Sequence, residues 1–157
     1  MKVLGLITEY NPFHFGHKFH LDTAKEITGA EYSIAIMSGS FVQRGEPSIV
    51  DKWTKAKMAI DNGVDLVIEL PFIFSTQSAE LFAYGGVALL HGLKIVDYLV
   101  FGSELGSLDY LKEIATILVE EPPYYKKSLK NYLDMGYSFS VSRSNSLEDY
   151  FNKYNTK

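Results

Sequence analysis

Short apolar runs alternate with stretches of helical pattern along this chain, and that alternation limits the fold more than any other feature. The runs are almost continuously apolar, which is typical of parallel strands buried on both faces. Strands that alternate with helices join through right-handed crossovers. We therefore predict an α/β protein with a Rossmann-like, doubly wound parallel sheet and a helical C-terminal extension. The predicted strands are residues 2–8, 32–37, 65–70 and 96–101.

The stretches between and after these strands have helical patterns bounded by capping and breaking residues. Asp51 caps or begins one helix, whose apolar side carries Trp53 and Ala59. We expect Trp53 to lie in the core, and a stacking platform for a ligand is the alternative. From Ser138 onward the sequence is polar and serine-rich, and we assign no individual helix there within the helical C-terminal extension. The predicted helices are residues 17–27, 51–61, 78–90, 107–120 and 124–135.

Pro122-Pro123 and a change in charge divide the chain, and we predict domains at residues 1–121 and 122–157. Residues 1–120 carry a net charge of −6, whereas residues 121–157 carry +2. A dedicated nucleic-acid module is usually basic, so any polyanion would bind the tail. An ordinary solvated helix face is the alternative. The basic and aromatic tail residues are Tyr124, Tyr125, Lys126, Lys127, Lys130 and Tyr132.

Composition excludes several classes of protein. With 157 residues and 46% hydrophobic content, the chain has enough apolar material for a folded core. No apolar run reaches the roughly 18 residues of a membrane span, and the start lacks the features of a signal peptide. Cysteine is absent, which excludes disulfides, thiolate catalysis and cysteine zinc sites. We expect a soluble cytoplasmic domain without membrane contact, and no oligomeric state is predicted.

The motif His14-Phe15-Gly16-His17 lies between the first predicted strand and the next helix. Ligands of doubly wound sheets bind just beyond the carboxyl ends of strands. Glycine allows a phosphate to approach the backbone, and a helix N-terminus attracts anions. Two imidazoles three residues apart can donate hydrogen bonds to phosphate oxygens. His20 continues the spacing and leaves a metal site as an alternative, but residues six apart on a helix diverge, so no metal ligand is assigned.

Longer blocks of sequence resemble one family within the His-x-Gly-His nucleotidyltransferases. The chain resembles the bacterial tRNA(Met) cytidine acetate ligases, formerly described as uncharacterised predicted nucleotidyltransferases. A weaker similarity follows at residues 136–139 with Arg143. The blocks that carry the resemblance are residues 5–14 (GLITEYNPFH), 37–53 (MSGSFVQRGEPSIVDKW), 69–72 (ELPF) and 101–104 (FGSE).

This resemblance implies a nucleotidyltransferase fold and an ATP-dependent ligase. ATP and acetate would form acetyl-adenylate, and the wobble cytidine of elongator tRNA(Met) would take the acetyl group to give N4-acetylcytidine. Magnesium is expected as the counterion of ATP. His14 and His17 would stabilise the α-phosphate transition state. The implied ATP-binding residues are Ile7, Thr8, Glu9, Tyr10, Asn11, Pro12, Phe13, His14, Phe15, Gly16, His17, Lys18, Phe19, His20 and Gly102.

Residues 38–52 follow the second predicted strand and are our candidates for the acetate and cytidine side of the site. Gln43 and Arg44 offer polar contacts there. Lys52, which we also predict to be catalytic, would neutralise pyrophosphate or a tRNA phosphate. In the alternative interpretation, Arg44 and Lys52 only pair with Glu46 and Asp51.

The sequence differs from the family's pattern in two ways. The family's proteins are considerably longer, and the sequence contains no clear second phosphate-binding motif. We therefore expect an N-terminal fragment in which residues 1–121 bind ATP and residues 122–157 begin a truncated helical region. The missing part of the longer protein would supply most of the surface that binds tRNA(Met). A small-molecule adenylyltransferase and a catalytically incomplete nucleotide-binding module remain as alternatives.

Overall fold

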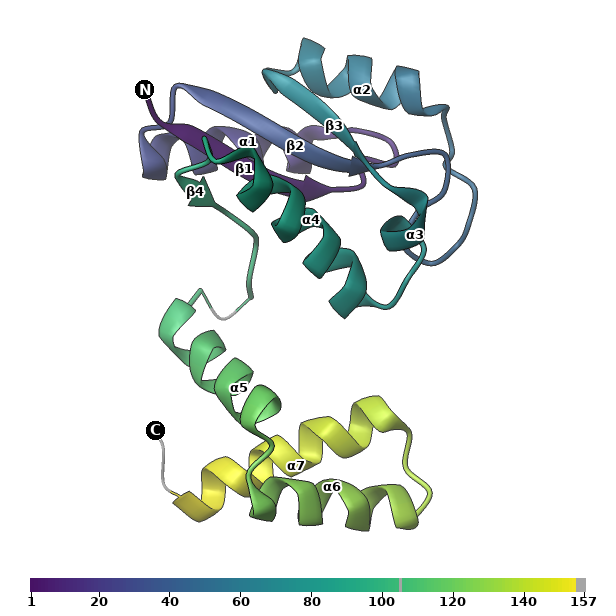
Figure 1. Ribbon diagram of the computed structural model, residues 1–157, viewed down its shortest axis with the longest axis vertical. Coiled ribbons are helices and arrows are strands. Elements are labelled where there is room, and N and C mark those ends of the chain that lie inside the picture. Colours follow the sequence, from purple (N-terminus) through teal and green to yellow (C-terminus); the bar gives the residue numbers. More distant parts are fainter. Residues whose placement is uncertain (105, 155–157) are drawn as a thin grey trace. The chain divides into compact units, whose positions relative to one another are not determined.

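The structure is a computed structural model that describes residues 1–104 and 106–154 (Figure 1). Its strands alternate with helices over the first part of the chain, and helices alone follow. The elements are β1 (Val3–Thr8), α1 (Phe15–Thr28), β2 (Tyr32–Ser38), α2 (Lys52–Asp61), β3 (Leu66–Leu70), α3 (Phe72–Ser75), α4 (Ala79–Leu93), β4 (Tyr98–Leu99), α5 (Leu108–Glu120), α6 (Pro123–Asp134) and α7 (Phe139–Tyr154).

The four strands form one parallel sheet in the order β3-β2-β1-β4. Gly5 of β1 pairs with Ile34 of β2, and Met37 of β2 pairs with Glu69 of β3. Strand order reverses at β1, because the chain moves outward through β2 and β3 and then crosses to the other side of β1. This topology confirms the predicted α/β class with a Rossmann-like parallel sheet.

The outer strands differ from the prediction. Most of β3 and both residues of β4 are at least partly exposed, because each strand lies at an edge of the sheet. Strand β4 is also shorter than the predicted residues 96–101. Before it begins, the Asp97 carboxylate accepts a 2.8 Å hydrogen bond from the Val3 N–H, and the Asp97 N–H donates to the Val3 carbonyl at 2.9 Å. Asp97 therefore extends the attachment of β4 to β1.

Two apolar clusters lie on opposite faces of the sheet. Alternate residues of β1 belong to the two clusters, because successive side chains of a strand point to opposite faces of the sheet. Leu4 and Leu6 pack with Leu21 of α1 and Ala59 of α2. The cluster on the other face contains Val3, Ile34, Ile36, Leu70 and Leu90, with Leu90 contributed by α4. Helices α1 and α2 therefore cover one face of the sheet and α4 covers the other.

Two glycines in α4 allow close packing against its neighbours. A Cβ added at Gly86 would lie 2.7–2.9 Å from side-chain atoms of Ile7 in β1, and one added at Gly85 would lie 2.6 Å from two atoms of Phe74 in α3. Both distances are too short for carbon atoms in contact. The Gly85-Gly86 pair, which lowers the helical propensity of this segment, is therefore explained by close approach.

The contacts divide the chain into two compact units, Met1–Gly102 and Ser103–Lys157. Helix α5 thus belongs to the second unit, whereas the predicted division at residue 121 placed it with the first. Residues 155–157, which that prediction included, lie outside the described residues. The division into functional domains stays a prediction.

In the second unit, α6 packs against α7. The Ser128 hydroxyl of α6 donates to the Asp149 carboxylate of α7 at 2.5 Å. Ser142 and Ser146 are buried four residues apart on α7, where small side chains allow the helices to approach closely. Helix α7 lies in the predicted helical C-terminal extension, in a serine-rich stretch to which no individual helix had been assigned. No helix in the described part of the chain is long and apolar enough to cross a membrane.

Candidate active site

His14 and His17 cap the N-terminus of α1. His14 is the N-cap residue with an extended backbone, and its Nδ1 accepts a 3.1 Å hydrogen bond from the Gly16 N–H. The Nδ1 of His17 accepts in return from the His14 N–H at 3.3 Å. The two rings stack with centroids 3.6 Å apart. Because both Nδ1 atoms accept, each neutral ring carries its proton on Nε2, which leaves two Nε2–H donors for a ligand.

Gly16 leaves room for the His14 ring at the helix N-terminus. A Cβ at this position would lie 2.9 Å from Cε1 of the His14 ring, so glycine is needed for the ring to reach the helix terminus. The Gly16 N–H is already engaged by His14 in this structure. A phosphate could accept a hydrogen bond from this N–H only if the His14 ring moved or shared the donor. Helix α1 begins at Phe15 rather than at the predicted residue 17.

His17 lies against two other aromatic rings. Its centroid is 4.8 Å from that of Tyr10 and 5.6 Å from that of Phe13. Burial lowers the pKa of His17 below its ordinary value of 6.5, and the neighbouring imidazoles of His14 and His20 lower it further. The neutral form of His17 is therefore favoured at pH 7, and an anionic ligand would raise its pKa.

Tyr10 supports the segment between β1 and α1. Its backbone has φ +45, an uncommon conformation for a residue other than glycine, and its side chain is 2% exposed. The ring packs edge-on against Phe13 at 4.7 Å. Burial raises the pKa of the Tyr10 hydroxyl to about 12, and the nearby Thr8 hydroxyl offsets a smaller part of this rise. Neither hydroxyl has a hydrogen-bond partner in geometric range within the described residues.

An open pocket of about 480 Å³ lies beside the two histidines. Its size is within the range of small-molecule sites. One wall comes from the segment that joins β1 to α1, and the other comes from the loop after β2. The lining residues are Glu9, Tyr10, Asn11, Pro12, His14, His17, Val42, Arg44 and Glu46. The structure thus brings Arg44 together with both predicted catalytic histidines.

Lys52 lies elsewhere in this structure. Its ammonium group pairs with the Glu69 carboxylate at 2.7 Å and lies 5.4 Å from the centroid of the Trp53 ring. These residues line a separate small pocket with Ser38 and Gly39, at the carboxyl ends of β2 and β3. Within the described residues Lys52 pairs with neither Glu46 nor Asp51, so the alternative interpretation of local ion pairs does not hold for Lys52 there. A catalytic role for Lys52 stays a prediction.

On α2, Trp53 is exposed and Lys55 is buried. Trp53 is 75% exposed, so the prediction that it lies in the core is wrong. Lys55 is completely buried, and its ammonium group donates to the carbonyls of Ser38 at 2.9 Å and Glu9 at 3.2 Å. Burial lowers its pKa, while the carboxylates of Glu9 and Glu69 oppose this shift. The only sequence signal for Lys55 is its position four residues before the small residue Ala59 on one helix face.

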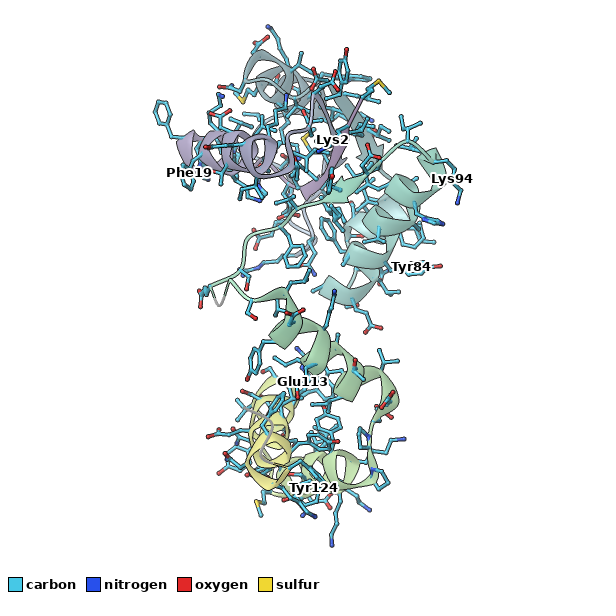
Figure 2. The ribbon with its side chains drawn as sticks, turned by 90° about the vertical axis from the view of Figure 1, so that its left-hand side faces the viewer. Lys2, Phe19, Tyr84, Lys94, Glu113 and Tyr124 are labelled. Atoms are coloured by element: carbon cyan, nitrogen blue, oxygen red, sulfur yellow. The ribbon has the colours of Figure 1, made fainter. Side chains whose placement is uncertain are left out.

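The remaining predicted ATP-binding residues do not all face the histidine pocket. Phe15 is 94% exposed and Phe19 is 72% exposed, and Figure 2 shows Phe19 extending away from α1. Lys18 forms an ion pair with Asp22 one turn further along the same helix. Gly102 lies in an exposed segment after β4 and is not among the pocket-lining residues. Their contacts with ATP stay predictions.

A metal site has no support in the described ranges 1–104 and 106–154. There, no three His, Cys, Asp or Glu side chains come close enough together to hold a metal ion. The Nε2 atom of His20 is buried without a hydrogen-bond partner in this same part of the chain. The described structure therefore does not gather His14, His17 and His20 into a group that could bind a metal.

Comparisons with known proteins identify the family to which this chain belongs. Residues 1–157 match the HIGH Nucleotidyl Transferase family. A tRNA(Met) cytidine acetate ligase of Thermoanaerobacter sp. (strain X514) is 57% identical over 97% of this chain, and one of Clostridium perfringens (strain SM101 / Type A) is 52% identical over 99%. The crystal structure of Thermotoga maritima TmcAL bound with alpha-thio ATP superimposes with a TM-score of 0.92 at 47% identity, covering 99% of this chain.

The chain spans only part of each of these proteins. It covers 38% of the Thermoanaerobacter protein, 39% of the Clostridium protein and 37% of the Thermotoga chain.

Proposed function

Since this chain belongs to the HIGH nucleotidyltransferase family, we propose that it forms the ATP-binding part of an ATP-dependent tRNA(Met) cytidine acetate ligase. The observation that carries the proposal is the reciprocal cap formed by His14 and His17, which leaves the Nε2–H donors of both rings available at a helix N-terminus. Such donors stabilise the negative charge that develops on a phosphate during displacement. The identity to named ligases supports acetate and tRNA(Met) as the further substrates.

The proposed reaction has two steps. A carboxylate oxygen of acetate attacks the α-phosphorus of ATP, and the bond from this phosphorus to the bridging oxygen breaks. Pyrophosphate leaves, and acetyl-adenylate forms. The exocyclic amine of the wobble cytidine then attacks the acetyl carbon, AMP leaves, and the amine loses a proton. Because acetate attacks as a carboxylate, the first step needs orientation and charge stabilisation rather than a general base.

The proposal assigns different tasks to the residues described above. His14 and His17 donate hydrogen bonds to the triphosphate. Mg²⁺ accompanies ATP as its counterion, held by phosphate oxygens rather than by a cluster of protein ligands. The region that recognises tRNA(Met) belongs in large part to the longer protein, and the reaction takes place in the cytoplasm.

Acetate-dependent exchange between ATP and labelled pyrophosphate tests this function. The assay compares this chain with the longer Thermotoga protein, and calorimetry measures ATP binding to each. We expect ATP binding in both and exchange that requires acetate in the longer protein. His17→Ala should lower the exchange rate by about 10²–10³-fold, whereas His91→Ala, in the last turn of α4, should leave it unchanged. Pyrophosphate exchange that does not require acetate would instead support a small-molecule adenylyltransferase. Absence of ATP binding would reject the proposal.

A further inference from the structure

Residues 40–48 form a tight hairpin between β2 and α2. The Gly45 N–H donates to the Val42 carbonyl at 2.8 Å, which closes a four-residue turn with Gln43 and Arg44 at its two central positions. Gly45 has φ +78, a conformation that glycine adopts at little cost. The Val42 N–H donates to the Glu46 carbonyl at 3.0 Å, and Phe41 and Pro47 form an antiparallel bridge. The hairpin therefore has a defined shape with Arg44 at its tip.

Side chains of the segment after β1 hold this hairpin at both ends. At the tip, the Glu9 carboxylate accepts from the Gln43 N–H at 2.6 Å. At the base, the Asn11 side-chain oxygen accepts from the Ser48 hydroxyl at 2.8 Å and from the Ile49 N–H at 2.7 Å. These contacts join residues more than thirty positions apart in the sequence. Glu9 and Asn11 thus use their acceptor oxygens to position the hairpin.

The hairpin places a cation in the pocket that the histidines line. Arg44 shares that pocket with His14 and His17, and it forms no ion pair within 4 Å in the described residues, although Glu9 and Glu46 also line the walls. A guanidinium group presents a planar fork of donors that matches the two oxygens of a carboxylate or a phosphate. An exposed arginine on a tightly held turn loses little backbone freedom when it binds such a group.

We propose that Arg44 binds an oxyanion in the histidine pocket, and that Glu9 and Asn11 are positioning residues that hold the Arg44 hairpin. This inference rests on the proposed function. It adds that the Arg44 guanidinium group binds a negatively charged group of one of the substrates. The oxyanion is a phosphate of ATP or the carboxylate of acetate, since both present the same oxygen geometry to the guanidinium group.

The experiment separates the two sources by measuring the Kd of ATP and the KM of acetate in a longer relative, chosen because its sequence has the same residues at the positions of Asn11, Arg44 and Lys57. Arg44→Met should weaken one of these constants by about 10- to 100-fold. A rise in the ATP Kd identifies a phosphate contact, and a rise confined to the acetate KM identifies a carboxylate contact. Arg44→Lys keeps the charge without the fork and should recover only part of the loss. The exposed Lys57→Ala, on α2, is the matched control and should leave both constants unchanged.

The positioning role is tested by a double-mutant cycle with Asn11→Ala. A residue that acts only through Arg44 should weaken the same constant as Arg44→Met, and this effect should vanish in the Arg44→Met background. Equal effects of Asn11→Ala in both backgrounds would reject the positioning role. If wild-type protein binds ATP and Arg44→Met changes neither constant, the oxyanion contact is rejected. If wild-type protein does not bind ATP at all, the proposed function itself fails.

Discussion

The buried ammonium group of Lys55 donates a 2.9 Å hydrogen bond to the main-chain carbonyl of Ser38. It also reaches the Ser38 hydroxyl at 3.3 Å and the Glu9 carbonyl at 3.2 Å. Ser38 ends β2, and Glu9 follows β1 directly. A side chain from α2 therefore joins the carboxyl ends of the two central strands, at the edge of the sheet where the histidine segment and the Arg44 hairpin begin.

Removal of the Lys55 ammonium group should destabilise the fold. Lys55→Met leaves the Glu9 and Ser38 carbonyls without their donor, and an unsatisfied buried polar group costs about 1–3 kcal/mol. We expect a decrease of this size in the free energy of unfolding, measured with urea. Lys57→Met changes an exposed lysine in the same helix and should shift stability by less than about 0.5 kcal/mol. Equal stability of the two variants would contradict a structural role for Lys55.

The glycines of α4 should respond differently to alanine according to their neighbours. Gly86→Ala places a Cβ against Ile7 and should destabilise the protein by about 1–3 kcal/mol. At Gly92 no atom lies within 4 Å of an added Cβ, so Gly92→Ala should raise stability by up to about 1 kcal/mol through helical propensity. Thermal unfolding of the two variants measures both effects. A stabilising Gly86→Ala would show that α4 and β1 are further apart than described.

ATP should raise the pKa of His17. In the free protein, burial and the neighbouring imidazoles of His14 and His20 hold this pKa below 6.5. A phosphate beside the ring favours the imidazolium form, so binding takes up protons and the affinity increases as the pH falls through the window between the bound and free pKa values. Titration of the imidazole resonances by NMR, with and without ATP, measures the shift. In His17→Gln the same pH dependence should be weaker, because the His17 imidazole no longer takes up a proton. Identical His17 titration curves with and without ATP would contradict a phosphate contact.

Tyr10 should contribute to unfolding at alkaline pH. The pKa of its hydroxyl is raised to about 12 in the folded protein, so its stabilising contribution is present below pH 10 and is lost progressively as the pH rises toward 12. At pH 11 the loss is about 1 kcal/mol relative to pH 8. Tyr10→Phe removes the ionisable group, and urea unfolding at the two pH values should show a correspondingly smaller decrease. The exposed Tyr84→Phe is the control, and a Tyr10→Phe variant that behaves like it would contradict the prediction.

Local patterns predict the strands and most helices of this protein because each apolar run or cap acts within a few residues. Asp51 accepts hydrogen bonds from the Trp53 and Thr54 N–H groups, as expected of a cap. The motif of His14 and His17 was likewise visible, because both residues belong to one strand-to-helix connection. Periodicity alone placed Trp53 in the core, but α2 is turned so that Lys55 faces inward instead.

Features that depend on distant partners were not predictable in this way. Arg44 and Lys52 lie in the same loop region of the sequence, so local patterns do not distinguish their sites. The fold places them in different pockets. Helix α7 was missed because its serines look like a loop until α6 is placed beside them. In each case the contact that sets the environment of the residue joins elements that are remote in sequence. Composition and local spacing therefore cannot predict it.

The attachment of Asp97 to Val3 has a consequence for the way the protein is made. Strand β1 lies between β2 and β4, and β4 is the last of the four strands to leave the ribosome. One edge of β1 therefore remains without backbone partners while the ribosome adds the residues up to Asp97. An unpaired edge can pair with other chains. This edge of β1 therefore stays available for pairing until β4 has left the ribosome and has paired with it.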